Sequence, residues 1–146
     1  MEYDFTIWSG IKLIDKLYKL KQTQLNQELL KKQQLNNKLH EIEEKIKNIQ
    51  HQLVTSGVKM FGSIGDFKVL AIHKNSLKFE KKQLEDKKRS LLHQISLLDE
   101  KIVEFQKEVE QFDYILKQNM KKKLKEIEKK EQISANEFIQ ARWMVS

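Results

Sequence analysis

A strict seven-residue spacing of apolar side chains runs through the second half of this sequence. Seven residues keep that step without interruption: Leu70, Leu77, Leu84, Leu91, Leu98, Phe105 and Phe112. Such a repeat holds one seam of an α-helix against a partner helix over its whole length, which is typical of a coiled coil. The second seam position is apolar only from Ile95 onward, because lysines occupy it upstream. The sequence therefore predicts a coiled-coil helix whose seam is stronger in its second half.

The composition suits long helices with a thin core. The chain has 146 residues and no proline, 34% of it is charged, and only 8% is aromatic. Proline costs about 3 kcal/mol inside a helix, so its absence permits uninterrupted helices. Cysteine is also absent, which excludes disulfides and thiolate metal sites. No apolar run approaches the ~18 residues of a membrane span, and Glu2 and Asp4 stand where a secretory signal would be basic. We expect a cytoplasmic protein without a cofactor.

Three glycines, Gly57, Gly62 and Gly65, mark the place where the chain is expected to turn. A first periodic segment precedes them, with apolar residues alternately four and three apart from Leu35 to Leu53. We predict an all-α fold that forms one domain over residues 1–146. Its expected parts are a first helix at about 6–54, a turn at about 55–65, a longer second helix at about 66–133 and a C-terminal tail at 134–146.

The two periodic segments match as an antiparallel coiled-coil hairpin. One register pairs Ile49 with Leu70, Ile42 with Leu77, Leu35 with Leu84 and Ile14 with Phe105. The same register places Lys32 opposite Lys88, and these two ammonium groups would repel each other. It also places Glu28 opposite Leu91, unless Leu29 or Leu30 rotates into the seam. The register thus predicts a loosened layer around residues 28–32 and 88–91.

In this register the first helix ends near residue 6, opposite about residue 113. The second helix then continues alone, and residues 117–130 of that overhang contain seven lysines and two glutamates. Trp8 is expected to cover the open end of the hairpin against Phe112. Trp143 lies in a short amphipathic stretch beyond the overhang, which is either a disordered tail or an apolar binding surface.

No catalytic constellation is apparent, so we expect a protein that is not an enzyme. The turn glycines lack the lysine and the serine or threonine of a phosphate-binding loop, and the four histidines are scattered. The lysine-rich overhang could be a solvated face or could dock on an acidic protein. Nucleic acid is a less favoured partner, because the lysines are not interleaved with arginine or aromatic residues.

The arrangement resembles the FliJ/YscO family, the central-stalk proteins of flagellar and virulence type III export machines. The residues that carry the resemblance are the C-terminal run from Lys129 to Arg142, in which a charged helix closes with Glu137-Phe138 and an arginine four positions on. The glycine-containing turn before a leucine-rich helix is also similar. Of the family's aromatic cluster early in the second helix, Phe67 and Phe79 are present.

The resemblance implies a mechanical function in protein transport and flagellum biogenesis. A stalk of this kind inserts into a hexameric export ATPase, regulates it, and links it to the membrane export gate and to export chaperones, at the cytoplasmic face of the inner membrane. The residues that the resemblance assigns to the ATPase ring are Trp8, Lys117, Lys121, Lys122, Lys123, Lys125, Phe138, Arg142 and Trp143. Those assigned to the export gate are His73 and Phe79.

Two other classes of function stay open at this point. The chain could be a structural or tethering coiled-coil adaptor that assembles with another coiled-coil chain. It could also, less favourably, be a basic helical protein associated with nucleic acid. The sequence does not distinguish a flagellar from a virulence export system.

Overall fold

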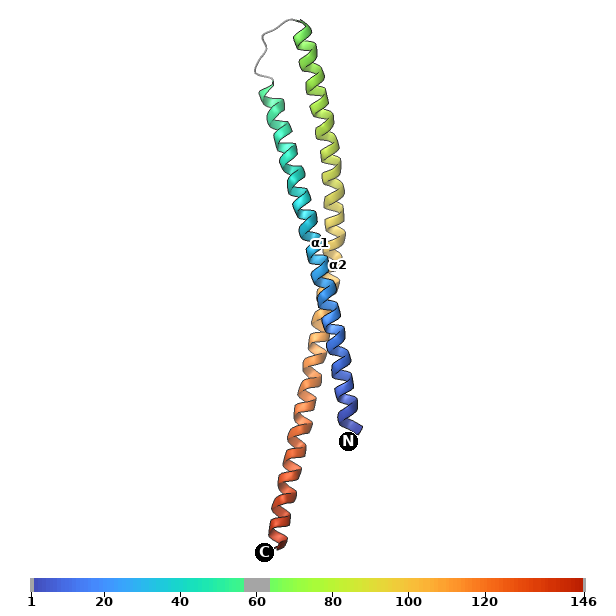
Figure 1. Ribbon diagram of the computed structural model, residues 1–146, viewed down its shortest axis with the longest axis vertical. Coiled ribbons are helices and arrows are strands. Elements are labelled where there is room, and N and C mark those ends of the chain that lie inside the picture. Colours follow the sequence, from blue (N-terminus) through green and yellow to red (C-terminus); the bar gives the residue numbers. More distant parts are fainter. Residues whose placement is uncertain (1, 57–63, 146) are drawn as a thin grey trace. The chain divides into compact units, whose positions relative to one another are not determined.

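The computed structural model describes residues 2–56 and 64–145, and these residues form two long helices (Figure 1). Helix α1 spans Glu2–Thr55 and helix α2 spans Ile64–Val145, and the described residues contain no strand. The predicted all-α class is confirmed. Helix α2 continues to Val145, although the sequence predicts a tail from residue 134. The predicted turn falls largely on residues 57–63, which lie outside the described residues.

The end of α1 follows from local chemistry. Thr55 Oγ1 donates to the His51 carbonyl at 3.0 Å and to the Gln52 carbonyl at 3.2 Å. The Ser56 backbone N–H donates to the same Gln52 carbonyl, and Ser56 Oγ donates to the Leu53 carbonyl. Two of these carbonyls, those of Gln52 and Leu53, are among the last four of the helix and have no partner within it, so Thr55 and Ser56 supply their donors. They allow α1 to end at Thr55 without leaving these carbonyls unsatisfied.

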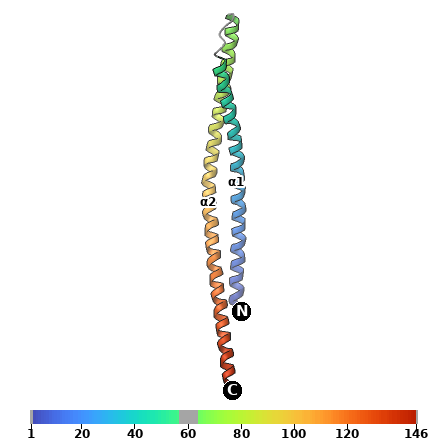
Figure 2. The same cartoon turned by 90° about the vertical axis from the view of Figure 1, so that its left-hand side faces the viewer.

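The chain divides into two compact units, which we describe separately. Unit 1 contains Met1–Asn26 and Val103–Ser146, and unit 2 contains Gln27–Ile102. Each unit therefore combines a part of α1 with a part of α2. In unit 1, the C-terminal part of α2 continues beyond the N-terminal end of α1 in both views (Figures 1 and 2).

The predicted seam positions are the least exposed positions of both helices. In unit 2 the core is a cluster of Ile49, Leu77 and Leu84, with three partly buried residues of α1 packed against it: Ile42, Ile46 and Leu53. In unit 1, Ile11 is only 6% exposed. No described side chain is fully buried, because two helices can enclose only a thin stripe.

The predicted register is wrong by one heptad. Phe105 is expected to face Ile14, but Lys21 lies over its ring at 5.3 Å from the centroid, seven residues further along α1. The core cluster shows the same shift, because Ile49 groups with Leu77 rather than with Leu70. A heptad pattern is unchanged by a slip of seven residues, so apolar spacing alone does not select between these registers.

The expected repulsion between Lys32 and Lys88 does not occur. Lys32 Nζ lies 2.6 Å from Asp99 Oδ1, and Lys88 Nζ lies 3.6 Å from Glu43 Oε1. The shifted register gives each of these seam lysines a carboxylate on the other helix. The loosened layer is therefore replaced by two ion pairs between α1 and α2.

Candidate interaction surfaces

A band of lysines on α2 lies beside the N-terminal part of α1 in unit 1. It consists of five of the residues assigned to the ATPase ring: Lys117, Lys121, Lys122, Lys123 and Lys125. Lys117 Nζ lies 2.9 Å from Asp113 Oδ2, and this hydrogen bond together with the carboxylate charge raises the pKa of Lys117. All of the band except Lys123 is exposed.

Trp8 contacts Lys123 rather than covering the end of the hairpin against Phe112. The ammonium group of Lys123 lies over its indole ring, in a cation–π contact, and Trp8 is 47% exposed. Residue 8 of α1 therefore reaches residue 123 of α2, well past Phe112. The shift of the register by one heptad accounts for this difference, because it places each residue of α1 opposite a residue seven positions further along α2.

The uncovered end of α2 begins later than predicted and is not basic. Every described residue from 127 to 144 is exposed. This extension carries three basic residues, Lys129, Lys130 and Arg142, and three acidic residues, Glu128, Glu131 and Glu137. The predicted basic overhang is therefore wrong, since most of its lysines lie beside α1 instead.

The extension ends in an apolar surface. Phe138, Ile139 and Trp143 are 68%, 52% and 78% exposed, and Met144 is 90% exposed. Phe138, Ile139 and Trp143 line a shallow hollow of about 410 Å³ together with Arg142. We call these five residues the apolar end. Exposed apolar groups gathered in this way often mark a site of protein association.

The two residues assigned to the export gate lie in unit 2, on the first turns of α2. Phe79 is 63% exposed and His73 is also exposed. Ile72 and Val69 are exposed beside them in sequence, at 69% and 67%. These side chains are open to solvent.

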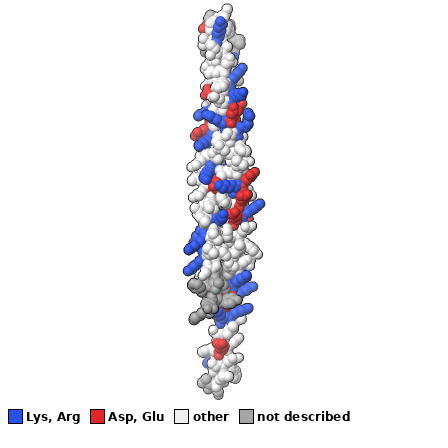
Figure 3. Space-filling view, turned by 90° about the vertical axis from the view of Figure 1, so that its right-hand side faces the viewer, with Lys and Arg blue, Asp and Glu red and all other residues white. Residues whose placement is uncertain are grey.

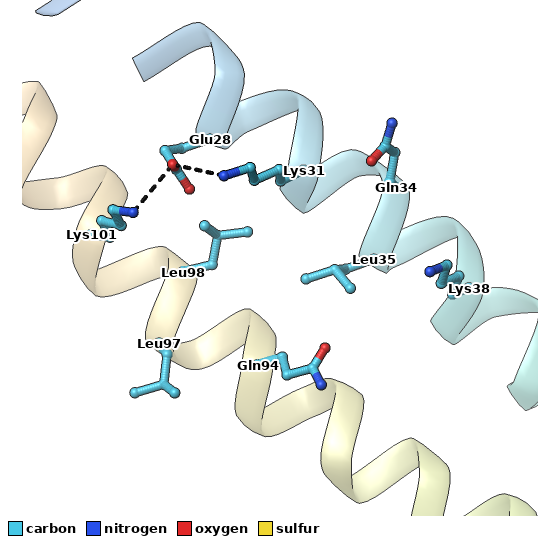
Figure 4. A pocket seen from close by; sticks show the side chains of 9 residues that line it. All are labelled: Glu28, Lys31, Gln34, Leu35, Lys38, Gln94, Leu97, Leu98 and Lys101. Atoms are coloured by element: carbon cyan, nitrogen blue, oxygen red, sulfur yellow. Dashed lines mark hydrogen bonds and ion pairs between the residues drawn. The ribbon is translucent and has the colours of Figure 1, made fainter. Parts of the chain in front are cut away.

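A charged residue, Glu28, is buried in the seam, and neither neighbouring leucine takes its place. Glu28 is 7% exposed, whereas Leu29 and Leu30 are 41% and 56% exposed. Its Oε1 lies 3.2 Å from Lys31 Nζ and 3.3 Å from Lys101 Nζ of the other helix. Both contacts are drawn as dashed lines in Figure 4. Burial raises the pKa of Glu28, but the two lysines outweigh that effect and hold it below its usual value. Lys101 on α2 is the residue that explains why a carboxylate can occupy this seam position.

The described residues contain no group of three or more side chains that could bind a metal ion. In the same part of the chain, no helix is long and apolar enough to cross a membrane. Basic and acidic side chains are interspersed on the face drawn in Figure 3. No family model, curated protein or solved structure matches the chain.

Proposed function

We propose that this chain is a non-catalytic stalk protein of a flagellar or type III protein export apparatus. The observation that carries the proposal is the apolar end, which stands on an exposed helical extension next to a band of lysines. An aromatic cluster at the tip of a helix can insert into a cavity of a ring-shaped partner. The proposed partner is the hexameric export ATPase.

The proposed architecture is one antiparallel coiled-coil hairpin with a longer C-terminal helix. Two ion pairs within unit 2 support the antiparallel arrangement. Glu43 pairs with Lys88, whereas Lys32, which comes earlier in α1, pairs with Asp99, which comes later in α2. In this hairpin, the apolar end enters the ATPase ring and the lysine band meets the rim. The protein acts by binding and carries out no chemistry of its own.

The proposed location is the cytoplasmic face of the inner membrane, where the other end of the hairpin would meet the export gate. The exposed side chains of Phe79 and His73 are the proposed gate contacts, with no insertion into the membrane. Export chaperones are further proposed partners.

The test uses the full-length protein and the hexameric export ATPase of the same organism. We expect the protein to increase the rate of ATP hydrolysis by the ring. The double variant Phe138→Ser/Trp143→Ser should weaken that effect on the order of tenfold, since buried aromatic anchors contribute most of the energy of an interface. Val103→Ser changes an equally helical but remote apolar residue, 47% exposed, and should leave the effect intact.

A tethering coiled-coil adaptor is the alternative that the structure also favours in one respect. Apolar residues on the outer surface of the helices, such as Leu13 and Ile72, are 60% and 69% exposed and could pack on further helices. Sedimentation distinguishes the two functions, because a tether should form dimers or larger assemblies and a stalk should be monomeric. A lack of binding to the ATPase, together with stable oligomers, would overturn the stalk proposal.

A further inference from the structure

Three shallow hollows lie end to end along one flank of the helix pair in unit 2. Lys38 lines both the first and the second hollow, and Lys45 and Lys87 line both the second and the third. Their volumes are about 420, 370 and 460 Å³. On α1 they extend from Glu28 to Ile49, which at 1.5 Å per residue is roughly 30 Å. Together they form one groove parallel to the helix axes.

Lysines line this groove from both helices. Lys31, Lys38 and Lys45 come from α1 at a spacing of seven, and Lys87 and Lys101 come from α2. We call this surface the lysine groove. Lys38, Lys45 and Lys87 face the same middle hollow, and none of the three forms an ion pair with a described carboxylate. Lysines on opposite helices repel each other and destabilise the helix pair, because opposite charges are favoured at such positions.

Three glutamates also line the hollows, Glu28, Glu41 and Glu80, but the five lysines outnumber them. Glu28 pairs with Lys31 and Lys101, whereas Glu41 and Glu80 form no ion pair with a described lysine. Asp99 and Glu43 bind the seam lysines Lys32 and Lys88, and Glu85 lies 3.9 Å from Lys81. The lysines in the seam therefore have acidic partners, whereas those in the middle of the groove do not. An incoming anionic surface would supply the missing charge.

The floor of the groove is apolar. Ile42, Leu84 and Leu91 line the middle hollow, and Leu35 and Leu98 point into the space between the helices in the first hollow (Figure 4). Apolar side chains of a partner could be buried on this floor while its acidic side chains meet the lysines. Both features are presented by an amphipathic helix, which lies along a groove through residues three and four apart.

We propose that the lysine groove binds an acidic amphipathic helix of about 20 residues from another protein, which adds a third helix to unit 2. The length of the groove matches that of such a helix. A second copy of this chain is disfavoured, because its net charge of +7 would repel a basic groove. Nucleic acid would pair with the lysines but would leave the leucines and the isoleucine without apolar contacts. The proposal does not depend on the stalk function.

The test measures binding of a fluorescein-labelled helical peptide by anisotropy. The peptide has about 20 residues, leucines at the two seam positions of each heptad and glutamates beside them. Two further peptides replace either the glutamates by lysines or the leucines by serines. The protein variant Lys38→Glu/Lys45→Glu/Lys87→Glu reverses the groove charge. The matched control, Lys47→Glu/Lys68→Glu/Lys82→Glu, changes three exposed lysines of unit 2 that line none of the hollows.

We expect the acidic peptide to bind the wild type, and the groove variant to weaken binding at least about tenfold while the control changes it less than about twofold. Both altered peptides should bind more weakly than the parent. If the groove variant loses helix content, Lys→Gln changes at the same three positions replace it. Equal binding by both variants, no binding by the wild type, tighter binding of a short DNA duplex to the same lysines, or self-association through the groove would each overturn the proposal.

Discussion

Replacing Lys32 by glutamate tests the register of unit 2 by the sign of its effect. In the structure this change removes the ion pair with Asp99, whose N–O distance is 2.6 Å, and places two carboxylates together. In the register predicted from the sequence, Lys32 would face Lys88, and the same change would replace a repulsion by an attraction. Lysine and glutamate have similar helix propensities, so the charge dominates the difference.

The size of the effect follows from the exposure of the pair. The side chains of Lys32 and Asp99 are 37% and 45% exposed, so solvent screens most of their interaction and leaves about 0.5–1 kcal/mol. Repulsion between the introduced carboxylate and that of Asp99 adds a few tenths, since both side chains can swing apart. We expect Lys32→Glu to lower the free energy of unfolding by about 1 kcal/mol, or roughly 2–4 °C in Tm.

The assay is urea and thermal unfolding followed by circular dichroism, at about 0.05 M and about 1 M NaCl. Asp99→Lys added to Lys32→Glu should restore most of the lost stability, and high salt should reduce all of these differences. Lys12→Glu is the control, because Lys12 has no ion pair with a described residue and its neighbours Asp15 and Lys16 carry opposite charges. A variant Lys32→Glu that is more stable than the wild type, with no rescue by Asp99→Lys, would refute the register.

Three further changes test the packing and the buried charge. Gly10→Ala should raise the free energy of unfolding by about 0.5–1 kcal/mol in the same unfolding assay, because a Cβ at Gly10 would meet no atom within 4 Å and alanine favours the helix. Leu84→Ala should lower it by about 2–3 kcal/mol, near the lower end for buried leucines, since Leu84 is still 8% exposed; a loss below about 0.5 kcal/mol would contradict its place in the core. The pKa of Glu28 is lower in the folded chain than its unfolded value of about 4.5. Ionised Glu28 should therefore contribute fully to the free energy of unfolding above about pH 4.5, and this contribution should disappear as the pH falls through the lower folded pKa. Glu28→Gln should therefore make acid unfolding less steep, and an unchanged pH profile would show that Lys31 and Lys101 do not stabilise the ionised form.

The sequence predicted which residues lie in the seam but not which residues face each other. Leu77, Leu84 and Ile95 are all buried, as their spacing predicts. Which residues face them on the other helix depends on single charged residues, and these repeat less regularly along the sequence than the leucines do. Asp99 and Glu43 are the residues that distinguish the two registers, and they stand beside the seam rather than in it. The pairs Lys32–Asp99 and Lys88–Glu43 therefore carry information on the register that the spacing of the leucines lacks.

The candidate surfaces were predictable to a smaller degree. The sequence places Trp143 in an amphipathic stretch beyond the overhang, and in the structure this stretch is helical with Phe138 and Trp143 exposed. The spacing alone does not indicate the lysine groove, although Lys31, Lys38 and Lys45 repeat every seven residues as clearly as the leucines do. These lysines form a groove only together with the side chains of α2 that lie opposite them, and the apolar spacing does not determine which side chains those are.

The heptad shift also changes which force would bring a partner to the end of α2. If α1 ended opposite residue 113, a long lysine-rich helix would stand alone and long-range attraction to an acidic partner would dominate. With Trp8 beside Lys123, the extension that stands alone has equal numbers of basic and acidic residues and exposes Phe138 and Trp143. Its association must then depend mainly on burial of apolar surface, which salt screens little. The lysine band, set back from the tip, can orient an approaching partner but contributes less to holding it.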